Sequence, residues 1–350
     1  MFIFGYIKPP ESMKNTILTC TALLVLSAAA CKKEKDPPKE RRDETYAVGA
    51  ASSGNPELQK AVLWINDSAT ALSDHNSVAT GVAINGSDVY VSGAIYTTTL
   101  QAVYWKNNTV HFLPDDKHIY SPGKVIIDQG NVYILARAAS DPASGKSKTA
   151  YWKNGTLTEL SPTNDSSTIM DIFISEGNIY QTETEHLKGG KLINRYLKNG
   201  NPVILQGDEH RVHSYRSLQV AGGDVYVLGR NNTSGNLVFW KNGQVAENPA
   251  SADYYPFQLT TEGNNIYLFA IRKDVSGSVI RCWKNGIEQS FNNIKDFTPT
   301  GVYIANGRIY AFGQSMADFN VATYTYDGTA YILHKKSFSL IWDMTARQVR

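Results

Sequence analysis

The pentapeptide Tyr151-Trp152-Lys153-Asn154-Gly155 decides the fold, because the chain repeats it. Close copies are Phe239-Trp240-Lys241-Asn242-Gly243 and Cys282-Trp283-Lys284-Asn285-Gly286. Weaker copies are Trp64-Ile65-Asn66-Asp67, Trp105-Lys106-Asn107-Asn108, Leu197-Lys198-Asn199-Gly200 and Tyr326-Asp327-Gly328. The Trp position of these copies falls at residues 64, 105, 152, 197, 240, 283 and 326, so successive copies are 41 to 47 residues apart.

A second landmark lies between these copies. It is a turn that contains Gly, followed by a β-branched residue and Tyr. It ends at Tyr90, Tyr133, Tyr180, Tyr226, Tyr267 and Tyr310, with Tyr46 as a degenerate first copy. A repeat of roughly 40–45 residues built from short strands is typical of a β-propeller, in which each blade is a four-stranded sheet. The sequence therefore predicts an all-β propeller.

The unit from residue 214 to 249 indicates how each repeat folds. Apolar runs at residues 216–220, 225–229 and 237–240 predict three strands, and residues 244–247 predict a short outer one. An Asn-Gly pair between apolar runs is a strong hairpin signal, because a type I′ turn needs positive φ at both central residues. The runs are nearly continuous, as expected for strands that pack on both faces. We therefore expect the recurrent Trp and Tyr to fill the space between blades.

The two ends of the repeat region decide the number of blades. Residues 45–64 match the second and third strands of a unit but have no first strand before them. Residues 337–342 form one strand after a complete last unit. Pairing the two would complete a blade, leave no free sheet edge and give seven blades over residues 45–345. Six blades with frayed ends is the alternative.

The beginning of the chain reads as an export signal. Lys14 precedes an apolar run at residues 17–26, which is too short to span a membrane, and small residues then lead to Cys31. This segment resembles a bacterial lipoprotein signal, which implies an acylated Cys31 and attachment to the membrane through that lipid only. Ala28 stands where such signals usually have Leu, so cleavage without lipidation is the alternative.

The chain accordingly divides into three segments. Residues 1–30 are the predicted signal peptide, residues 31–44 a charged flexible tether that has nothing to bury, and residues 45–350 a single propeller domain. Translation starts at Met1 or Met13, and the sequence leaves that choice open.

The composition excludes several classes of protein. The 350 residues carry a net charge of +2, without the basic excess of nucleic-acid-binding proteins, and 42% of them are hydrophobic, as in ordinary globular proteins. Cys282 is the one cysteine after Cys31, so no disulfide within the domain is expected. Because Cys282 aligns with the residue before each Trp, we expect a buried structural thiol.

The sequence lacks the familiar catalytic and cofactor motifs. It has no phosphate loop, no Gly-x-Ser-x-Gly, no zinc-protease helix motif and no Cys pair. The Asp box of sialidase-type propellers and the Trp-docking motif of quinoprotein dehydrogenases are also missing. His210 and His213 could share a metal ion, but separate surface histidines are the simpler interpretation. We expect no cofactor, no metal site and no catalytic residue.

The repeated Tyr-Trp-Lys-Asn-Gly and Gly-Asn-Val-Tyr pattern resembles a group of uncharacterised Bacteroidetes propeller lipoproteins. The resemblance covers residues 45–345. It implies a propeller fold and a place in the cell envelope, on an outer membrane lipoprotein that faces the periplasm or the cell surface. It brings no catalytic residue with it.

The loops that enter each predicted inner strand are richer than the rest in aromatic residues, His and Arg. In a propeller such loops gather around one mouth of the central channel and often form a binding surface. Tyr rings beside Arg suit sugars or peptides, by stacking and a few directed hydrogen bonds. The candidate ligand-binding residues are Tyr120, His213, Tyr215, Arg216, Tyr254 and Tyr255.

Three hypotheses about function follow. The first is an envelope-anchored, monomeric lipoprotein whose propeller is a non-catalytic binding or scaffolding module for a glycan or a protein. The second is a polysaccharide lyase or hydrolase that uses groups at the channel mouth, such as His213, Tyr215 and Arg216. The third is a structural component of an envelope complex. Ionisable groups that converge in one pocket would favour the enzyme.

Overall fold

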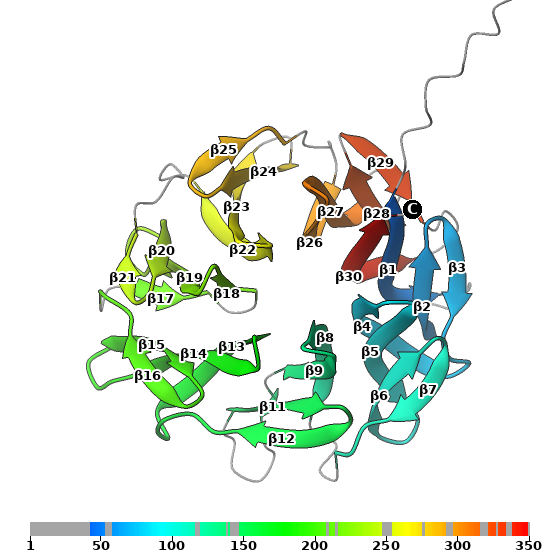
Figure 1. Ribbon diagram of the computed structural model, residues 1–350, viewed down its shortest axis with the longest axis horizontal. Coiled ribbons are helices and arrows are strands. Elements are labelled where there is room, and N and C mark those ends of the chain that lie inside the picture. The colour runs from blue at the N-terminus through cyan, green and yellow to red at the C-terminus, as the bar shows by residue number, and fades with distance from the viewer. Residues whose placement is uncertain are drawn as a thin grey trace, which may run out of the picture. The chain divides into compact units, whose positions relative to one another are not determined.

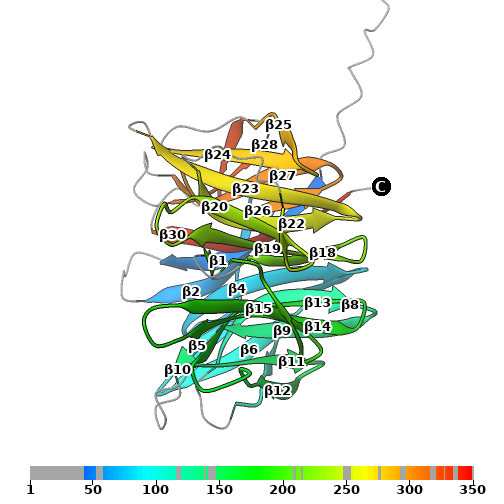
Figure 2. The ribbon, with the colours of Figure 1, turned by 90° about the vertical axis from the view of Figure 1, so that its left-hand side faces the viewer.

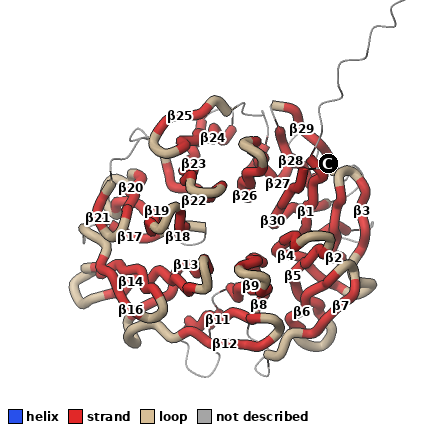
Figure 3. Tube along the Cα trace, in the orientation of Figure 1, coloured by secondary structure: helices blue, strands red, loops and turns tan. Residues whose placement is uncertain are grey.

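The computed structural model describes residues 43–52, 58–115, 120–137, 139–140, 147–207, 210–213, 216–246, 254–274, 277–291, 297–315, 321–326, 328–333 and 338–348. The predicted signal peptide, Cys31, nearly all of the predicted tether and Tyr215 lie outside these residues. The described part of the chain contains strands and turns only (Figure 3), and no helix in it is long and apolar enough to cross a membrane.

The strands form seven antiparallel sheets arranged in a ring (Figure 1), and the sheets are stacked side by side when the ring is seen from its edge (Figure 2). This confirms the predicted seven-bladed β-propeller, and the alternative of six blades is wrong. We number the blades from the one that contains the first strand, and name their strands from the channel outward.

Blades 1 to 4 are formed as follows: blade 1 by β30 (Ser339–Gln348), β1 (Asp43–Ser52), β2 (Gln59–Ile65) and β3 (Ser68–Ala71); blade 2 by β4 (Asn76–Asn85), β5 (Asp88–Tyr96), β6 (Leu100–Lys106) and β7 (Thr109–Phe112); blade 3 by β8 (Ser121–Asp128), β9 (Asn131–Arg137), β11 (Ser147–Lys153) and β12 (Thr156–Leu160), with β10 (Ala139–Ser140) paired to β11; blade 4 by β13 (Ser167–Ser175), β14 (Asn178–His186), β15 (Leu192–Lys198) and β16 (Asn201–Ile204).

Blades 5 to 7 are formed as follows: blade 5 by β17 (His210–Val212) and β18 (Leu218–Ala221), which both pair with β19 (Asp224–Asn231), then β20 (Leu237–Lys241) and β21 (Gln244–Val245); blade 6 by β22 (Tyr255–Glu262), β23 (Asn265–Asp274), β24 (Gly277–Lys284) and β25 (Ile287–Gln289); blade 7 by β26 (Phe297–Ala305), β27 (Arg308–Ser315), β28 (Val321–Tyr326) and β29 (Thr329–Ile332).

The two repeated sequence landmarks are the two sides of one contact. Asn154 and Gly155 have φ of 50° and 85°, as a type I′ turn requires. The Asn154 side chain accepts a hydrogen bond from the Val132 backbone N–H and donates one to Asn131, both at 2.9 Å. The Asn of the Trp-Lys-Asn turn therefore binds the residues just before the Tyr landmark. The same pair of bonds recurs at Asn107 with Val89 and Asp88, Asn199 with Ile179 and Asn178, Asn242 with Val225 and Asp224, and Asn285 with Ile266 and Asn265.

The landmark aromatic residues fill the space between blades, as predicted. In the described part of the chain, buried apolar residues form seven clusters, and each cluster joins two neighbouring blades. Trp152 of blade 3 is fully buried against blade 2, and its indole N–H donates to the Pro114 carbonyl at 2.8 Å. The preceding Tyr landmark carries the motif lysine on its ring, with the Lys153 nitrogen 5.4 Å from the Tyr133 centroid.

Blade 1 is completed by strands from the two ends of the repeat region. β1 pairs antiparallel with β30, from Asp43 opposite Gln348 to Ala51 opposite Ser339. Glu44 and Arg347 form an ion pair of 2.6 Å at one end of this pairing. The closure predicted for the ring is therefore confirmed, and β30 provides the strand next to the channel.

Candidate functional site

Every inner strand is interrupted at the same place. The pairing between the first two strands of a blade shifts register there in six blades, and in blade 5 the inner strand breaks into β17 and β18, with Arg216 at a φ of 54°. Such β-bulges redirect side chains and often lie next to functional sites. We call these positions the inner bulges; they lie at Thr80, Gly123-Lys124, Met170, Arg216, Phe257, Thr300 and Trp342.

Two of the inner bulges link their blade to the next through a threonine hydroxyl. Thr80 donates to the Pro122 carbonyl and Thr300 to the Ile341 carbonyl, each at 2.7 Å. In both places the following residue is Gly. An added Cβ at Gly81 would come within 2.3 Å of the Gly123 carbonyl oxygen, so the close approach of the neighbouring blade requires glycine there.

Other blades make the same link through a carboxylate or amide that follows the inner bulge. Asp171 accepts hydrogen bonds from the backbone N–H groups of Ser217 and Leu218, at 2.7 and 3.1 Å. Gln258 accepts from Val302 at 3.0 Å, and Asp343 accepts from Val82 at 3.2 Å. These polar side chains therefore position the inner strands around the channel.

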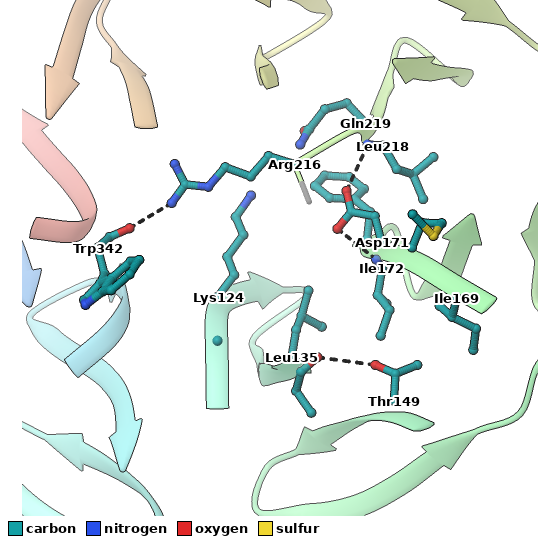
Figure 4. Close-up of a pocket in the computed structure, with 14 residues that line it drawn as sticks. Lys124, Leu135, Thr149, Ile169, Asp171, Ile172, Arg216, Leu218, Gln219 and Trp342 are labelled. Carbon is teal, nitrogen blue, oxygen red and sulfur yellow. Dashed lines mark hydrogen bonds between the residues drawn. The ribbon is translucent and has the colours of Figure 1, made fainter. Parts of the chain in front are cut away.

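Arg216 connects blades that are not neighbours. Its side chain leaves blade 5 and donates to the Trp342 carbonyl of blade 1 at 2.9 Å, as Figure 4 shows. The same guanidinium donates to Gln258 of blade 6 at 3.0 Å and forms an ion pair with Asp343 at 3.4 Å. It also lies over the Phe312 ring of blade 7, at 5.2 Å. Arg216 therefore crosses the central channel and is largely buried.

A cavity of about 370 Å³ opens beside Arg216, at the inner ends of blades 3, 4 and 5 (Figure 4). Most of its wall is apolar, and the polar groups come from a few side chains. The apolar lining includes Leu135, Ile169, Met170, Ile172, Phe173, Leu218 and Trp342, and the polar lining Lys124, Thr149, Asp171, Arg216 and Gln219. This volume is in the range of sites that hold small ligands.

Blade 4, which contributes to the cavity wall, lacks the Trp of the repeat. In blade 2, Trp105 packs against Gly93, where an added Cβ would come within 2.9 Å of the indole. At the equivalent places blade 4 has Leu197 in place of Trp and Glu183 in place of Gly. Leu is smaller than Trp, so the contact between blades 3 and 4 is less filled.

Glu183 brings a polar network into this contact. It is fully buried, accepts from the Thr163 backbone N–H at 3.2 Å and from Gln181 at 2.8 Å, and lies 3.9 Å from Arg195. Arg195 also forms an ion pair with Glu185. Blade 4 therefore replaces an aromatic packing surface with buried charges that are paired with one another.

Burial shifts the titration of three groups at the channel. Burial lowers the pKa of Lys124. The charges of Asp343 and Asp171 partly oppose that change, and the charge of Arg216 adds to it. Burial raises the pKa of Asp171, against the hydrogen bonds from Ser217 and Leu218 and the charge of Lys124. Burial also raises the pKa of Asp343, against the charges of Arg216 and Lys124. Each of the three groups is therefore biased toward its neutral form.

The Lys124 nitrogen has few partners. It lies 5.5 Å from the centre of the Phe173 ring. Among the described residues, no carboxylate oxygen lies within 4.0 Å of it. The Lys124 side chain points into the cavity in Figure 4, between Arg216 and the wall formed by blade 4. Lys124 is thus an amine that a ligand in the cavity could contact.

The residues predicted to bind a ligand do not gather at one place. Tyr120 is fully buried and packs edge to face on Trp152 at 6.2 Å, and Tyr254 packs the same way on Trp283 at 5.8 Å. Both rings therefore belong to the core of their blades. Tyr255, the next residue along the chain, is exposed.

His213 and Arg216 have different surroundings. The His213 backbone N–H donates to the Leu228 carbonyl at 2.9 Å, and burial together with the nearby charge of Arg230 lowers the pKa of its imidazole. Of the predicted residues that the structure describes, Arg216 alone lines the cavity. Its contacts are to other blades, so it has a structural role beside any contact with a ligand.

Lys124, Asp171 and Trp342 line the cavity but were not among the residues predicted to bind a ligand. Asp171 and Asp343 both follow an inner bulge directly, so aligning the first strands of the units would have drawn attention to them. The replacement of Trp by Leu197 was also visible in the repeat. No group of three or more His, Cys, Asp or Glu that could hold a metal ion occurs among the described residues.

The sequence matches no known family model and no curated protein, whereas many solved structures match its three-dimensional structure. A puromycin-hydrolyzing peptidase from Mycobacterium tuberculosis aligns over 84% of this chain and 53% of its own, with TM-score 0.55 and 9% identity. An acylaminoacyl peptidase from Pyrococcus horikoshii aligns over 83% and 50%, with TM-score 0.55 and 12% identity. The chain thus spans about half the length of these two peptidases.

A third structure matches over nearly its full length. The β-propeller domain of the Trilobed protease from Pyrococcus furiosus aligns over 83% of this chain and 91% of its own, with TM-score 0.53 and 9% identity. That domain is described as having an open velcro topology, whereas β1 and β30 pair here. At these identities the similarity is one of fold alone. The chain is a seven-bladed β-propeller similar in architecture to those of several peptidases.

Proposed function

We propose that this propeller is a non-catalytic binding module of the bacterial cell envelope and that its ligand is a glycan, one end of which enters the channel cavity. The observation that carries the proposal is the cavity itself. It combines an apolar wall with the amine of Lys124 and the carboxyl groups at Asp171 and Asp343 nearby. Few polar groups in an apolar pocket are typical of small-ligand sites.

The electrostatics of the cavity favour a neutral ligand. Lys124 and Asp171 are biased toward their neutral forms, and the charge of Arg216 is paired with Asp343. A charged ligand would lose its hydration without gaining a free counter-charge. Sugar hydroxyls both donate and accept hydrogen bonds, so they can satisfy an amine and a carboxyl group together. The Trp342 and Phe173 rings can cover the apolar faces of a pyranose.

The arrangement of the acids supports binding over hydrolysis. Glycoside hydrolysis uses two carboxyl groups on either side of the scissile bond, one as acid and one as nucleophile or base. Asp171 accepts backbone N–H groups of blade 5, and Asp343 accepts Val82 and pairs with Arg216. Both carboxyl groups therefore position the inner strands of other blades. Ionisable groups do converge at the cavity, which favours an enzyme, so polysaccharide lyase or hydrolase activity is kept as the second hypothesis, which an activity assay tests.

The location belongs to the same proposal and is supported by the sequence. An acylated Cys31 would anchor the domain through the charged residues between it and β1, on a lipoprotein like those of the Bacteroidetes group whose repeats it resembles. The test is expression in a bacterial host with radiolabelled palmitate. The wild type should carry label and sediment with membranes, and Cys31→Ser should do neither; equal labelling of the two would contradict the anchor.

The ligand is tested on a glycan array with purified protein. Wild type should bind a defined set of glycans, Lys124→Met should lose them, and the control Lys153→Met, at the exposed end of β11, should keep them. Lysine and methionine have side chains of similar length, so the cavity keeps its shape. No binding by the wild type, or equal binding by Lys124→Met, would contradict a glycan site in the cavity.

A protein is the alternative to a glycan as the ligand of this binding module, and exposed apolar residues on outer strands favour it. Ile204 of β16 is 59% exposed and Val245 of β21 is 45% exposed. These strands belong to neighbouring blades, which are joined by a hydrogen bond from Gln206 to the Gly243 carbonyl at 2.8 Å. A protein that co-purifies with the wild type and is lost from Ile204→Asp/Val245→Asp would support this candidate.

A further inference from the structure

We propose that the Lys124 amine forms a reversible imine with a small aldehyde in the cavity, of which the open-chain form of an aldose is one kind. The inference rests on the proposed function, because it names the chemical group at the end of the ligand that reaches the cavity. It goes beyond that function because it assigns a covalent step to one side chain.

The surroundings of Lys124 are those of a nucleophilic amine. The nitrogen faces the apolar cavity over the Phe173 ring at 5.5 Å, and no carboxylate oxygen lies within 4.0 Å of it among the described residues. The positive charge of Arg216 is held in the same region by Trp342 and Gln258. A lysine that is desolvated and close to another cation is activated as a nucleophile, because its neutral form is favoured. The lowered pKa of Lys124 agrees with this geometry.

The reaction needs no further reagent. The lone pair of the Lys124 nitrogen forms a bond to the aldehyde carbon, and the carbonyl oxygen takes up a proton to give a carbinolamine. The nitrogen then forms a double bond to carbon while the hydroxyl leaves as water. The nitrogen gives up two protons in all: one is taken up by the carbonyl oxygen, and the other leaves with the hydroxyl as water. The sum is amine plus aldehyde giving imine plus water.

The other lysines near aromatic rings provide an internal comparison. Lys106 and Lys241 lie over Tyr90 and Tyr226 at the surface turns. Hydrogen bonds to Asp88 and Asp224 raise the pKa of each amine above its usual value. Both groups therefore stay protonated near neutral pH. Because the pKa of Lys124 is lowered and the pKa values of Lys106 and Lys241 are raised, Lys124 should react faster than these lysines.

The test is reductive trapping with glycolaldehyde and cyanoborohydride at pH about 7, read by intact mass and peptide mapping. Wild type should gain an adduct at Lys124 first, with a yield that saturates as glycolaldehyde increases. Lys124→Arg, which keeps a cation but cannot form an imine, should lose that adduct, and Lys241→Arg should keep it. Equal thermal unfolding midpoints for the three proteins, measured by circular dichroism, ensure that each variant is folded.

Two results would overturn the inference. One is labelling spread over surface lysines with no preference for Lys124. The other is the same early adduct in Lys124→Arg as in the wild type. If trapping fails while the glycan array still shows binding that depends on the cavity, the covalent step is wrong and the binding module stands. If no glycan binds and Lys124 is still trapped selectively, the glycan is wrong and the reactive amine stands.

Discussion

Replacing Arg216 by Met tests whether the crossing of the channel stabilises the ring. The change removes hydrogen bonds to the Trp342 carbonyl and to Gln258, and it removes the ion pair with Asp343. Two hydrogen bonds contribute about 1 kcal/mol each. Loss of one partner of a buried ion pair costs about 3–5 kcal/mol in well-buried cases. The Asp343 side chain keeps 13% exposure and its bond from Val82, which reduces the cost of the lost ion pair to about 1 kcal/mol, so we expect a total loss near 3 kcal/mol.

The loss should depend on pH in a defined direction. Burial already raises the pKa of Asp343 in the folded protein, and removing Arg216 should raise it further. The folded variant then binds a proton that the unfolded chain, with a carboxyl pKa near 3.8, has released. Lower pH therefore favours the folded variant more than the wild type. The difference in free energy of unfolding should shrink between about pH 7.5 and about pH 5.

The assay is urea unfolding followed by tryptophan fluorescence at both pH values. Arg216→Met/Asp343→Asn is the matched control, because it removes the unpaired carboxylate together with the guanidinium; we expect it to recover at least about 1 kcal/mol. A loss below about 1 kcal/mol, or a loss that neither pH nor Asp343→Asn alters, would refute the reasoning. In that case Arg216 would act only through its contact with the Phe312 ring.

Three further predictions concern the repeat itself. Trp105→Ala should lower the free energy of unfolding, measured by urea unfolding, by about 4 kcal/mol. The loss in Leu197→Ala should be smaller than this by at least about 1 kcal/mol. Equal losses in the two variants would contradict the looser packing of blade 4. Asn242→Ala should lower the free energy of unfolding by about 2–3 kcal/mol, because it loses two hydrogen bonds and places Ala at positive φ. Asn242→Gly should lower it by less, because Gly tolerates positive φ. Calorimetry measures both losses, and equal losses would contradict a cost from positive φ. Burial raises the pKa of Cys282 to about 12 from an ordinary 9.0, so the thiol ionises first in the unfolded chain and stability falls as pH rises above 9.0. At about pH 10.5 ionisation of the thiol in the unfolded chain lowers the free energy of unfolding of the wild type by about 2 kcal/mol. The difference in free energy of unfolding between the wild type and Cys282→Ala should therefore be smaller at this pH than at about pH 7 by that amount.

The fold was predictable because the repeated residues each meet a local structural requirement of a blade. Trp152 marks a blade because it fills the gap to the previous blade, and Asn154 marks a turn because it tolerates positive φ and binds Asn131. These requirements recur in most blades, so the residues recur in the sequence. The number of blades followed from the pairing of β1 with β30, which the unmatched end units predicted.

The cavity was harder to predict because it depends on the inner bulges and on which side chain lies at each. Lys124 reaches the channel because the inner strand of blade 3 is bulged there, and sequence periodicity does not reveal a bulge. Tyr120 and Tyr254 lie in loops whose composition suggested a binding face, but each ring packs on the Trp of its own blade. Local composition does not determine on which side of a loop an aromatic ring is buried.

The pairing of β1 with β30 has a consequence for the order in which the protein assembles. The ribosome makes β1 before the strands of the other six blades and β30 after all of them, so blade 1 lacks its innermost strand until synthesis has passed every other blade. Partners so distant in sequence meet slowly, because a long loop must close first. Until then β1 has an unpaired edge that another chain could occupy. Holding the newly made chain apart from its copies should therefore raise the yield of closed rings.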